Sequence, residues 1–275
     1  MMRQHEEPPI MKKEHNLNQF IMEHLKNGTL TTDVFLQICS LPKLKKQYFN
    51  MLLDAGVNIC GMDEHGRNAL FCAAESGNLV LLRALLEEGL NPMKKDDSGE
   101  IPLSVAVRCG NLSVAECLLG KTKNPASVVD NEGSTLLHKA AWGDVPGIAR
   151  RLIDVYDIPP EVRDNDGRTA VHVAAYQGSC KMLKYLLKEK SGDVNSADND
   201  GRTPLFSGAY DGNLRTLKIL CEQGADLSIK DKSGLTAWEF ALGRKEFSAA
   251  KFLSGQLKME INSCSAAPGN SSSPD

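Results

Sequence analysis

A fixed repeat length is the strongest constraint on the fold of this 275-residue chain. Six four-residue segments that begin with Asp and end with Gly recur 33 or 34 residues apart. They start at Asp63, Asp96, Asp130, Asp164, Asp198 and Asp231. Regular recurrence at this period is the signature of a repeat architecture, in which each unit contacts only its neighbours. We therefore expect an array of similar units and not one globular core.

Each unit is typical of two short helices connected by tight turns. Asp and Gly favour a turn in the tetrad, and Thr169, Thr203 and Thr236 can each cap the helix that begins directly after it. Small residues such as Ala174-Ala175 let this first helix approach its neighbour closely. A mid-unit glycine ends the first helix, and Leu pairs such as Leu186-Leu187 form the apolar stripe of the second. Because two short helices cannot bury both faces alone, the units are expected to stack.

The repeated segments resemble ankyrin repeats. The T-P-L-H-x-A-A block of that family is matched by residues 169–175 and 203–206, and its L-L-x-x-G-A-D-V-N ending by residues 53–58 and 223–226. The resemblance implies an all-α ankyrin-repeat solenoid of helix-turn-helix units joined by β-turn or hairpin loops.

The period also predicts the domain organisation. We expect an N-terminal segment with a capping helix at 1–29, a degenerate repeat at 30–62, six repeats at 63–253 and a disordered Ser-rich tail at 254–275. Two loops depart from the pattern, at residues 120–125 and 158–161. In the third clear repeat, Gly143 follows Trp142 directly, one position earlier than the mid-unit glycine of the other repeats.

Composition excludes several classes of function. The net charge of −3 provides no general positive field, which disfavours nonspecific binding to nucleic acid or to membranes. No stretch resembles a signal peptide or a membrane-spanning helix, so we expect an intracellular protein of the cytoplasm or nucleus. The eight cysteines include no CxxC pair and lie mostly in apolar helical stretches. They favour buried reduced thiols over a disulfide framework.

Motifs for metal binding and catalysis are absent from the sequence. An EF-hand loop with Gly167 at its sixth position would need ligands at Val162 and Val173, which excludes calcium binding of that type. His138 and His172 share one repeat position, which favours histidines bonded to neighbouring turns over ligands or bases. A Cys–His dyad stays open, because such pairs need not be adjacent in sequence. We predict a non-enzyme without metal or cofactor.

The strongest functional feature is an alignment of aromatic residues. Trp142, Tyr176 and Tyr210 are 34 residues apart, and Arg168 and Arg202 form a parallel row. These residue types are enriched at interface hot spots. The resemblance implies partner binding on the concave side, through turn and first-helix residues. The candidate partner-binding residues are Trp142, Tyr176, Tyr210, Arg168, Arg202, Asp166, Asp200, Arg67 and Arg108. In the alternative, the aromatic residues cover helix ends and the arginines pair with Asp166 and Asp200.

These observations predict a monomeric adaptor or scaffold that binds one or more partner proteins on its concave face. The alternative is a regulatory or inhibitory subunit that occludes an active or localisation site of a partner through the two irregular loops. The resemblance also marks Asn195 as a candidate for oxygen-dependent hydroxylation, against a purely turn-stabilising role. Ser273, which precedes a proline, is a candidate phosphorylation site.

Overall fold

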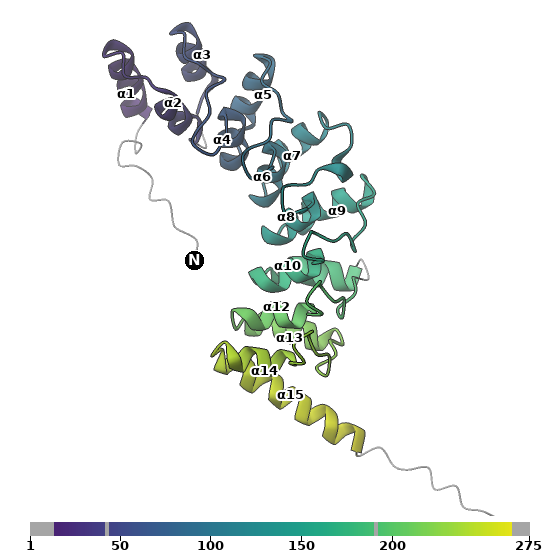
Figure 1. Cartoon of the computed structure of the whole chain (residues 1–275). Coiled ribbons are helices and arrows are strands. Elements are labelled where there is room, and N and C mark those ends of the chain that lie inside the picture. The colour runs from purple at the N-terminus through teal and green to yellow at the C-terminus, as the bar shows by residue number, and fades with distance from the viewer. Residues whose placement is uncertain (1–13, 42–43, 190–191, 266–275) are drawn as a thin grey trace, which may run out of the picture. The chain divides into compact units, whose positions relative to one another are not determined.

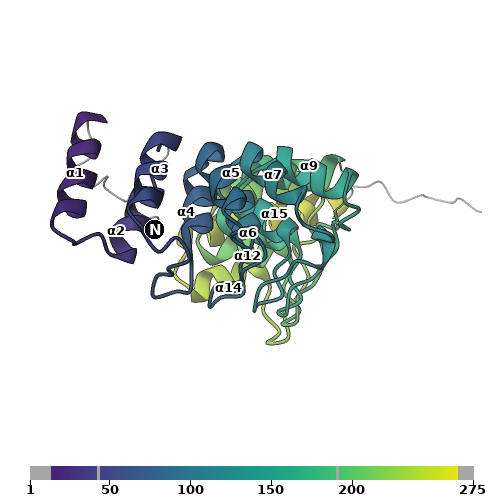
Figure 2. The same ribbon diagram turned by 90° about the horizontal axis from the view of Figure 1, so that it is seen from above.

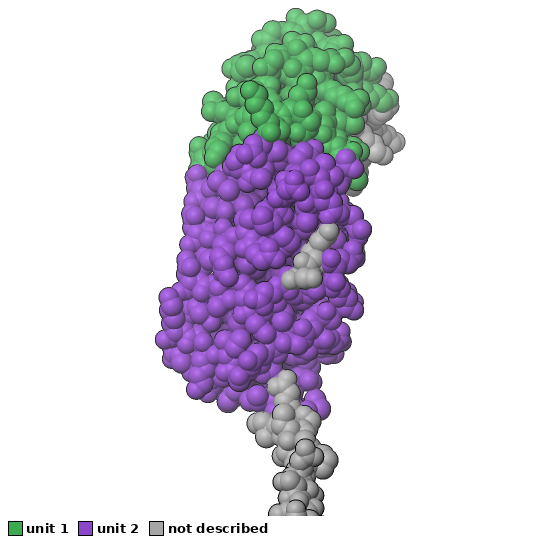
Figure 3. All heavy atoms as spheres, turned by 90° about the vertical axis from the view of Figure 1, so that its right-hand side faces the viewer, with its two compact units in different colours: residues 1–123 green, residues 124–275 purple. Residues whose placement is uncertain are grey.

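The computed structural model describes residues 14–41, 44–189 and 192–265. The chain divides into two compact units, Met1–Lys123 and Asn124–Asp275, which are coloured separately in Figure 3. Throughout the described ranges the regular elements are helices, and the only β-type pairings there are two isolated bridges, Val129 with Thr135 and Lys230 with Thr236. The expected all-α fold is thus confirmed.

Within residues 14–41 and 44–123, unit 1 contains one single helix followed by three helix pairs. Its elements are α1 (Glu14–Lys26), α2 (Thr32–Cys39), α3 (Lys46–Asp54), α4 (Ala69–Ser76), α5 (Leu79–Glu87), α6 (Pro102–Arg108) and α7 (Leu112–Leu119). The first helices α2, α4 and α6 pack in sequence, and the second helices α3, α5 and α7 do the same. Helix α1, at the position expected for a capping helix, lies beside α2 in both ribbon views (Figures 1 and 2).

The described part of unit 2, residues 124–189 and 192–265, contains a short 3-10 turn followed by four helix pairs. Its elements are η2 (Pro125–Ser127), α8 (Leu136–Trp142), α9 (Pro146–Asp154), α10 (Ala170–Gln177), α11 (Cys180–Lys184), the π-turn η3 (Tyr185–Glu189), α12 (Pro204–Tyr210), α13 (Leu214–Glu222), α14 (Ala237–Gly243) and α15 (Phe247–Ser265). The first helices α8, α10, α12 and α14 form one layer, and α11, α13 and α15 pack in a second layer (Figure 1).

The core of each unit consists of leucines and small residues on the facing sides of the helices. In unit 2 the side chains of Ala174, Ala175 and Leu186 are fully buried, and Phe206 is almost so. Burying one such Leu or Phe side chain stabilises the fold by about 1.5–3 kcal/mol. The small alanines allow α10 to pack closely against α8 and α12, so the stacking predicted from the sequence supplies the core.

Glycines close the turns where the backbone requires a positive φ angle. Gly178 ends α10 with φ = 80°, and a Cβ there would collide with the Asn213 side chain. At the equivalent position after α8 the chain has Asp144, which adopts φ = 55°. In this left-handed conformation, the Asp144 carboxylate accepts a hydrogen bond from the Met182 amide at 2.8 Å. The early glycine, Gly143, thus leaves the turn geometry unchanged.

Two expectations are corrected by the structure. The sequence predicts a disordered tail from residue 254, but α15 continues through Gly255 to Ser265. Ser273 and the last ten residues lie outside the described ranges. Thr203 occupies the cap position of α12, yet its hydroxyl lacks a hydrogen-bond partner within the described structure, since Phe206 stands where other repeats have His or Glu.

Candidate functional site

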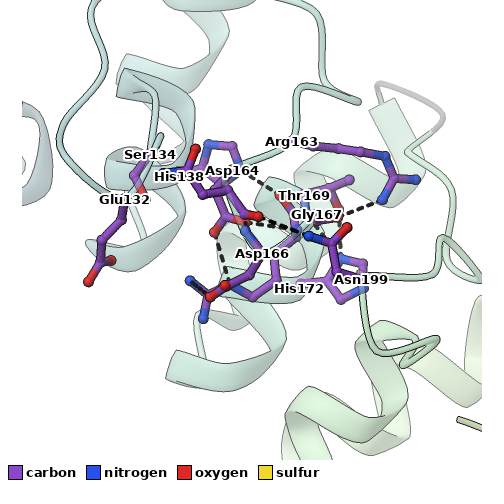
Figure 4. Close-up of polar contacts among 12 residues, drawn as sticks. Glu132, Ser134, His138, Arg163, Asp164, Asp166, Gly167, Thr169, His172 and Asn199 are labelled. Atoms are coloured by element: carbon purple, nitrogen blue, oxygen red, sulfur yellow. Dashed lines mark hydrogen bonds and ion pairs between the residues drawn. The ribbon is translucent and has the colours of Figure 1, made fainter. Parts of the chain in front are cut away.

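The Asp-Gly turns of unit 2 are built around a buried carboxylate. Asp164, whose side chain is 0% exposed, accepts hydrogen bonds from the backbone amides of Asp166 and Arg168 through Oδ1, at 3.0 and 2.9 Å. Its Oδ2 accepts a third bond from Arg168 Nε at 2.9 Å (Figure 4). One side chain therefore fixes both the turn and the orientation of the arginine that follows it.

Successive turns of unit 2 are joined by a regular hydrogen-bond ladder. The amides of Asn165, Asn199 and Lys232 donate to the carbonyls of Glu132, Asp166 and Asp200, each at 2.9 Å. The side chain of Asn199 also donates to the Asn165 carbonyl at 2.9 Å. Because each contact links one repeat to the next, the turn residues are held in a single register.

Histidines connect the helix starts of unit 2 to the following turns. Nδ1 of His172 accepts a hydrogen bond from the Thr169 amide at 3.1 Å, and Nε2 lies 3.1 Å from the Arg202 carbonyl oxygen. Since a carbonyl only accepts, Nε2 carries the proton. His138 repeats the pattern with Thr135 and the carbonyl of Arg168 (Figure 4). Burial lowers the pKa of both imidazoles. The structural interpretation of these histidines is confirmed.

The three aligned aromatic residues lie at the ends of the first helices of unit 2. We call Trp142, Tyr176 and Tyr210 the aromatic row; their exposed fractions are 46%, 39% and 36%. The rings of Tyr176 and Tyr210 are in contact, with centroids 5.4 Å apart. The row is therefore partly packed within the protein and still presents a large apolar area to solvent.

A cation–π cluster supports the C-terminal end of this row. The guanidinium carbon of Arg244 lies 3.4 Å from the ring centroid of Tyr210, and its Nε donates to the Tyr210 carbonyl at 3.0 Å. Phe240 contacts Tyr210 with centroids 6.3 Å apart, and Arg202 lies 4.9 Å above the Phe240 ring. Phe240 and Arg244 are not among the residues predicted from the sequence. The fixed register was the available signal, because it places the last repeat beside Tyr210.

The predicted arginines all form ion pairs inside their own unit. Arg168 pairs with Asp166 at 3.0 Å as well as with Asp164, and Arg202 pairs with Asp200 at 3.1 Å and with Asp231 at 3.4 Å. In unit 1, Arg67 contacts Asp63 at 3.2 Å and Glu75 at 3.6 Å, and Arg108 contacts Glu100 at 3.6 Å. The pairing of Arg168 and Arg202 with Asp166 and Asp200 matches the alternative given above.

Asn195 connects two neighbouring turns. Its Oδ1 accepts a hydrogen bond from the Asp226 amide at 2.8 Å, and its Nδ2 lies 3.5 Å from the Gly224 carbonyl. Both ends of the side-chain amide thus face the next repeat.

The two irregular loops are held by local contacts. Thr122 is buried and donates to the Leu118 carbonyl at 2.9 Å, while the buried Ile158 donates from its amide to the Leu152 carbonyl at 3.1 Å. A regular repeat has a bond one residue shorter here, from the Leu90 amide to the Leu85 carbonyl. The second loop is therefore one residue longer than the turn after α5, and so is the turn after η3, where the Gly192 amide donates to the Leu186 carbonyl.

The described side chains form neither a metal-binding cluster nor a disulfide. They include no group of three His, Cys, Asp or Glu residues that could hold a metal ion. No cysteine whose side chain the structure describes forms a disulfide, but only Cys39 and Cys72 among them are buried, which corrects the expectation of mostly buried thiols. Burial raises the pKa of the Cys39 and Cys72 thiols, which keeps them protonated, whereas a nucleophilic cysteine acts as the thiolate. Within the described ranges, the helices are too short or too polar to cross a membrane.

Comparison with known proteins identifies the class. A family model of ankyrin repeats in three copies matches residues 37–128 and 118–198, and a single ankyrin-repeat model matches residues 200–232. The chain belongs to the ankyrin-repeat family, whose repeats serve as protein–protein interaction modules and are generally non-catalytic. The search of curated proteins found no match.

One solved structure similar to this chain belongs to a protein complex. Its title describes the predatory endopeptidase Bd0816 from Bdellovibrio bacteriovorus in complex with immunity protein Bd3460. The matched chain is 30% identical, with a TM-score of 0.54, and the match covers 71% of the present chain and 99% of that chain.

Proposed function

We propose that this protein is a non-catalytic adaptor or scaffold that binds a partner protein at the aromatic row of unit 2. The observation that carries the proposal is the exposure of Trp142, Tyr176 and Tyr210 in one repeat register. Exposed apolar area of this kind marks interaction sites, and Trp and Tyr are the residues most enriched among hot spots. The proposal places this row on the concave face of the solenoid.

The contacts around the row support binding without large rearrangement. Arg244 and Phe240 hold the Tyr210 ring, and Tyr210 contacts Tyr176. The rings are therefore already ordered before a partner covers them. Binding would cost little side-chain entropy, which favours affinity. The Arg168–Asp166 and Arg202–Asp200 pairs offer donors and acceptors for the polar rim of the same interface. Arg67 and Arg108 would serve the corresponding role in unit 1.

The experiment identifies the partner first and then measures its affinity. A photo-crosslinking amino acid at Gln177, beside Tyr176, is used to label the partner in cells. The purified partner is then titrated with the wild type, with the single alanine variants of Trp142, Tyr176 and Tyr210, and with the triple variant. We expect the affinity to fall by about 2 kcal/mol, roughly thirtyfold, for the strongest single variant.

The matched control removes three other exposed apolar side chains, in Val80→Ala, Val155→Ala and Phe247→Ala. We expect this triple variant to bind the partner like the wild type. Thermal melting is measured for all variants. Unchanged affinity of the aromatic variants, or a large loss of their stability with affinity unaffected, would show that the rings only pack.

A second candidate function is inhibition by the irregular loops at 120–125 and 158–161. It is supported by the likeness to a structure that holds an endopeptidase and its immunity protein. Residues 154–161 are replaced by the regular turn of residues 87–93, and the partner's own activity is assayed with both proteins. Lost inhibition with intact binding would support this candidate, while unchanged inhibition would contradict it.

The remaining assignments are also proposals. We place the protein in the cytoplasm or nucleus as a monomer without cofactor. The cytoplasmic or nuclear location is consistent with the absence of disulfides among the described cysteines.

Asn195 is the candidate hydroxylation acceptor, although its contacts with Asp226 and Gly224 favour a turn-stabilising role. Peptide mapping of protein from animal cells that finds no added oxygen on this asparagine would remove the hydroxylation proposal.

A further inference from the structure

A second row of side chains runs along the second helices of unit 2. Arg150, Lys184, Lys218 and Lys251 occupy the same repeat position on α9, α11, α13 and α15, and are 34, 34 and 33 residues apart. We call these four residues the basic row. All four side chains are exposed. Because α11 packs against α13 and α13 against α15, their register places Lys184, Lys218 and Lys251 along one line.

The surroundings of the basic row are also mainly cationic. The exposed positions of α11, η3 and α13 carry five cations and two carboxylates, with no aromatic side chain among them. These residues are Lys181, Lys184, Lys188, Arg215, Lys218, Glu189 and Glu222. Glu189 is already paired with Arg150 at 2.6 Å. Lys184, Lys218 and Lys251 form no ion pair with any residue in the described ranges.

The near-neutral net charge of the chain hides this separation. Four carboxylates of unit 2, those of Asp164, Asp166, Asp200 and Asp231, lie at the turns and bind the arginines described above. The cations accumulate on the second helices, which the aromatic row does not occupy. The two rows therefore lie on different helices and have different chemistry.

We infer that the basic row binds an acidic segment of a second partner protein. Charge complementarity requires carboxylates spaced to meet cations on neighbouring helices, which lie about 8–10 Å apart. An acidic peptide in the polyproline II conformation satisfies this spacing with every third residue, because about three residues complete each turn and each rises about 3.1 Å. Single-stranded nucleic acid is disfavoured, because its binding proteins stack successive bases on aromatic side chains, whereas the exposed positions of α11, η3 and α13 have none and those described on α15 have only Phe247.

The test uses a fluorescein-labelled peptide of ten glutamates, followed by fluorescence anisotropy at two salt concentrations. We expect the full-length protein to bind the peptide more weakly at higher salt. The variant Lys184→Gln/Lys218→Gln/Lys251→Gln should lose about tenfold in affinity. The charge-preserving variant with arginine at the same three positions should bind like the wild type, which separates charge from any effect on folding.

The matched control removes three exposed lysines of unit 1, in Lys94→Gln, Lys121→Gln and Lys123→Gln. It has the same net charge as the first triple variant and should keep wild-type affinity. The alanine variant of the aromatic row should also keep it, so failure of the proposed function and failure of this inference are distinguishable. Equal losses in the two glutamine variants, no measurable binding, or tighter binding of a ten-nucleotide oligothymidylate would overturn the inference.

Discussion

Units 1 and 2 share one repeat geometry but differ in what they place at the same positions. At the ends of the first helices, unit 1 has Glu75 and Arg108, which pair with Arg67 and Glu100. Unit 2 has the aromatic row there. On the second helices, unit 1 has Arg83 and Glu116 where unit 2 has the basic row. The repeat fixes the core positions alone, so the surface chemistry of each unit is free to differ.

The two units also connect their repeats by different side chains. In unit 1, Asn111 donates from Nδ2 to the carbonyls of Ala74 and Glu75 at 2.7 and 2.9 Å. At the equivalent position of unit 2, Ser179 makes one bond to the Trp142 carbonyl, at 3.4 Å. There the histidines His138 and His172 provide the stronger connection. Each difference predicts an unequal response to the same substitution.

The largest effect is expected from the turn carboxylates. Asp63 and Asp164 accept the same three hydrogen bonds, but the Asp63 side chain is 25% exposed and that of Asp164 is 0% exposed. Asp164→Ala should cost about 3 kcal/mol of unfolding free energy, because it leaves two part-buried amides without their acceptor and removes one of the two carboxylates that pair with Arg168. Asp63→Ala should cost about 1 kcal/mol, since water replaces part of the lost contacts. Urea unfolding measures both.

The variant Asp164→Asn is the control for this pair. It keeps the Oδ1 acceptor for the two amides and loses the charge that faces Arg168, so its stability should lie between those of the wild type and Asp164→Ala. If Asp63→Ala and Asp164→Ala prove equally destabilising, burial of the carboxylate does not determine how much the turn contributes to the free energy of unfolding.

An intermediate effect is expected from the links at the ends of the first helices. Asn111→Ala removes two short bonds and leaves the two carbonyls without this donor, which should cost about 1.5 kcal/mol. Ser179→Ala removes one long bond and should cost about 0.5 kcal/mol. Thermal melting of both variants tests the difference, and a larger loss for Ser179→Ala would reverse this account of how the units are connected.

The smallest effect concerns pH and is expected in unit 2. Burial lowers the pKa of His138 and His172 below the ordinary value of 6.5, so the folded protein binds these protons less readily than the unfolded chain. The stability that the two neutral histidines contribute is present above the ordinary pKa of 6.5. It is lost as the pH falls below 6.5 toward their lowered pKa values. We expect the melting temperature to decrease between pH 7.5 and 5.5.

The His138→Gln/His172→Gln variant should show a smaller decrease over this interval, because its side chains have no proton to gain. The matched control is His65→Gln, which changes an exposed histidine of unit 1 and should keep the wild-type profile. Identical profiles for all three proteins would mean that the histidine links do not carry the pH response.

The parts of the fold that depend on the period could be predicted from the sequence. Asp and Gly at the turns, Thr at the helix starts and paired leucines gave the helix pairs, and the shared position of His138 and His172 gave their structural role. The family of the chain followed from the same motifs, and the family models confirm it.

The departures from the period could not be predicted in the same way. The positive φ angle of Asp144 accompanies a hydrogen bond to Met182, 38 residues further along the chain. Nε of Arg168 binds Asp164 in its own turn, whereas Nε of Arg202 binds Asp231 in the next repeat. The second contact depends on the spatial position of that repeat. Such contacts between repeats are set by tertiary packing, which local patterns do not encode.

The hydrogen-bond ladder between the turns has a consequence for partner choice. Because the amides of Asn165, Asn199 and Lys232 each bind the preceding turn at 2.9 Å, the backbone positions of unit 2 advance by one constant step per repeat. Packed helices set that step at about 8–10 Å. A partner that bound across several repeats, as proposed above, would have to present its anchoring groups at multiples of this distance, so the spacing of those groups would decide the fit as well as their chemistry.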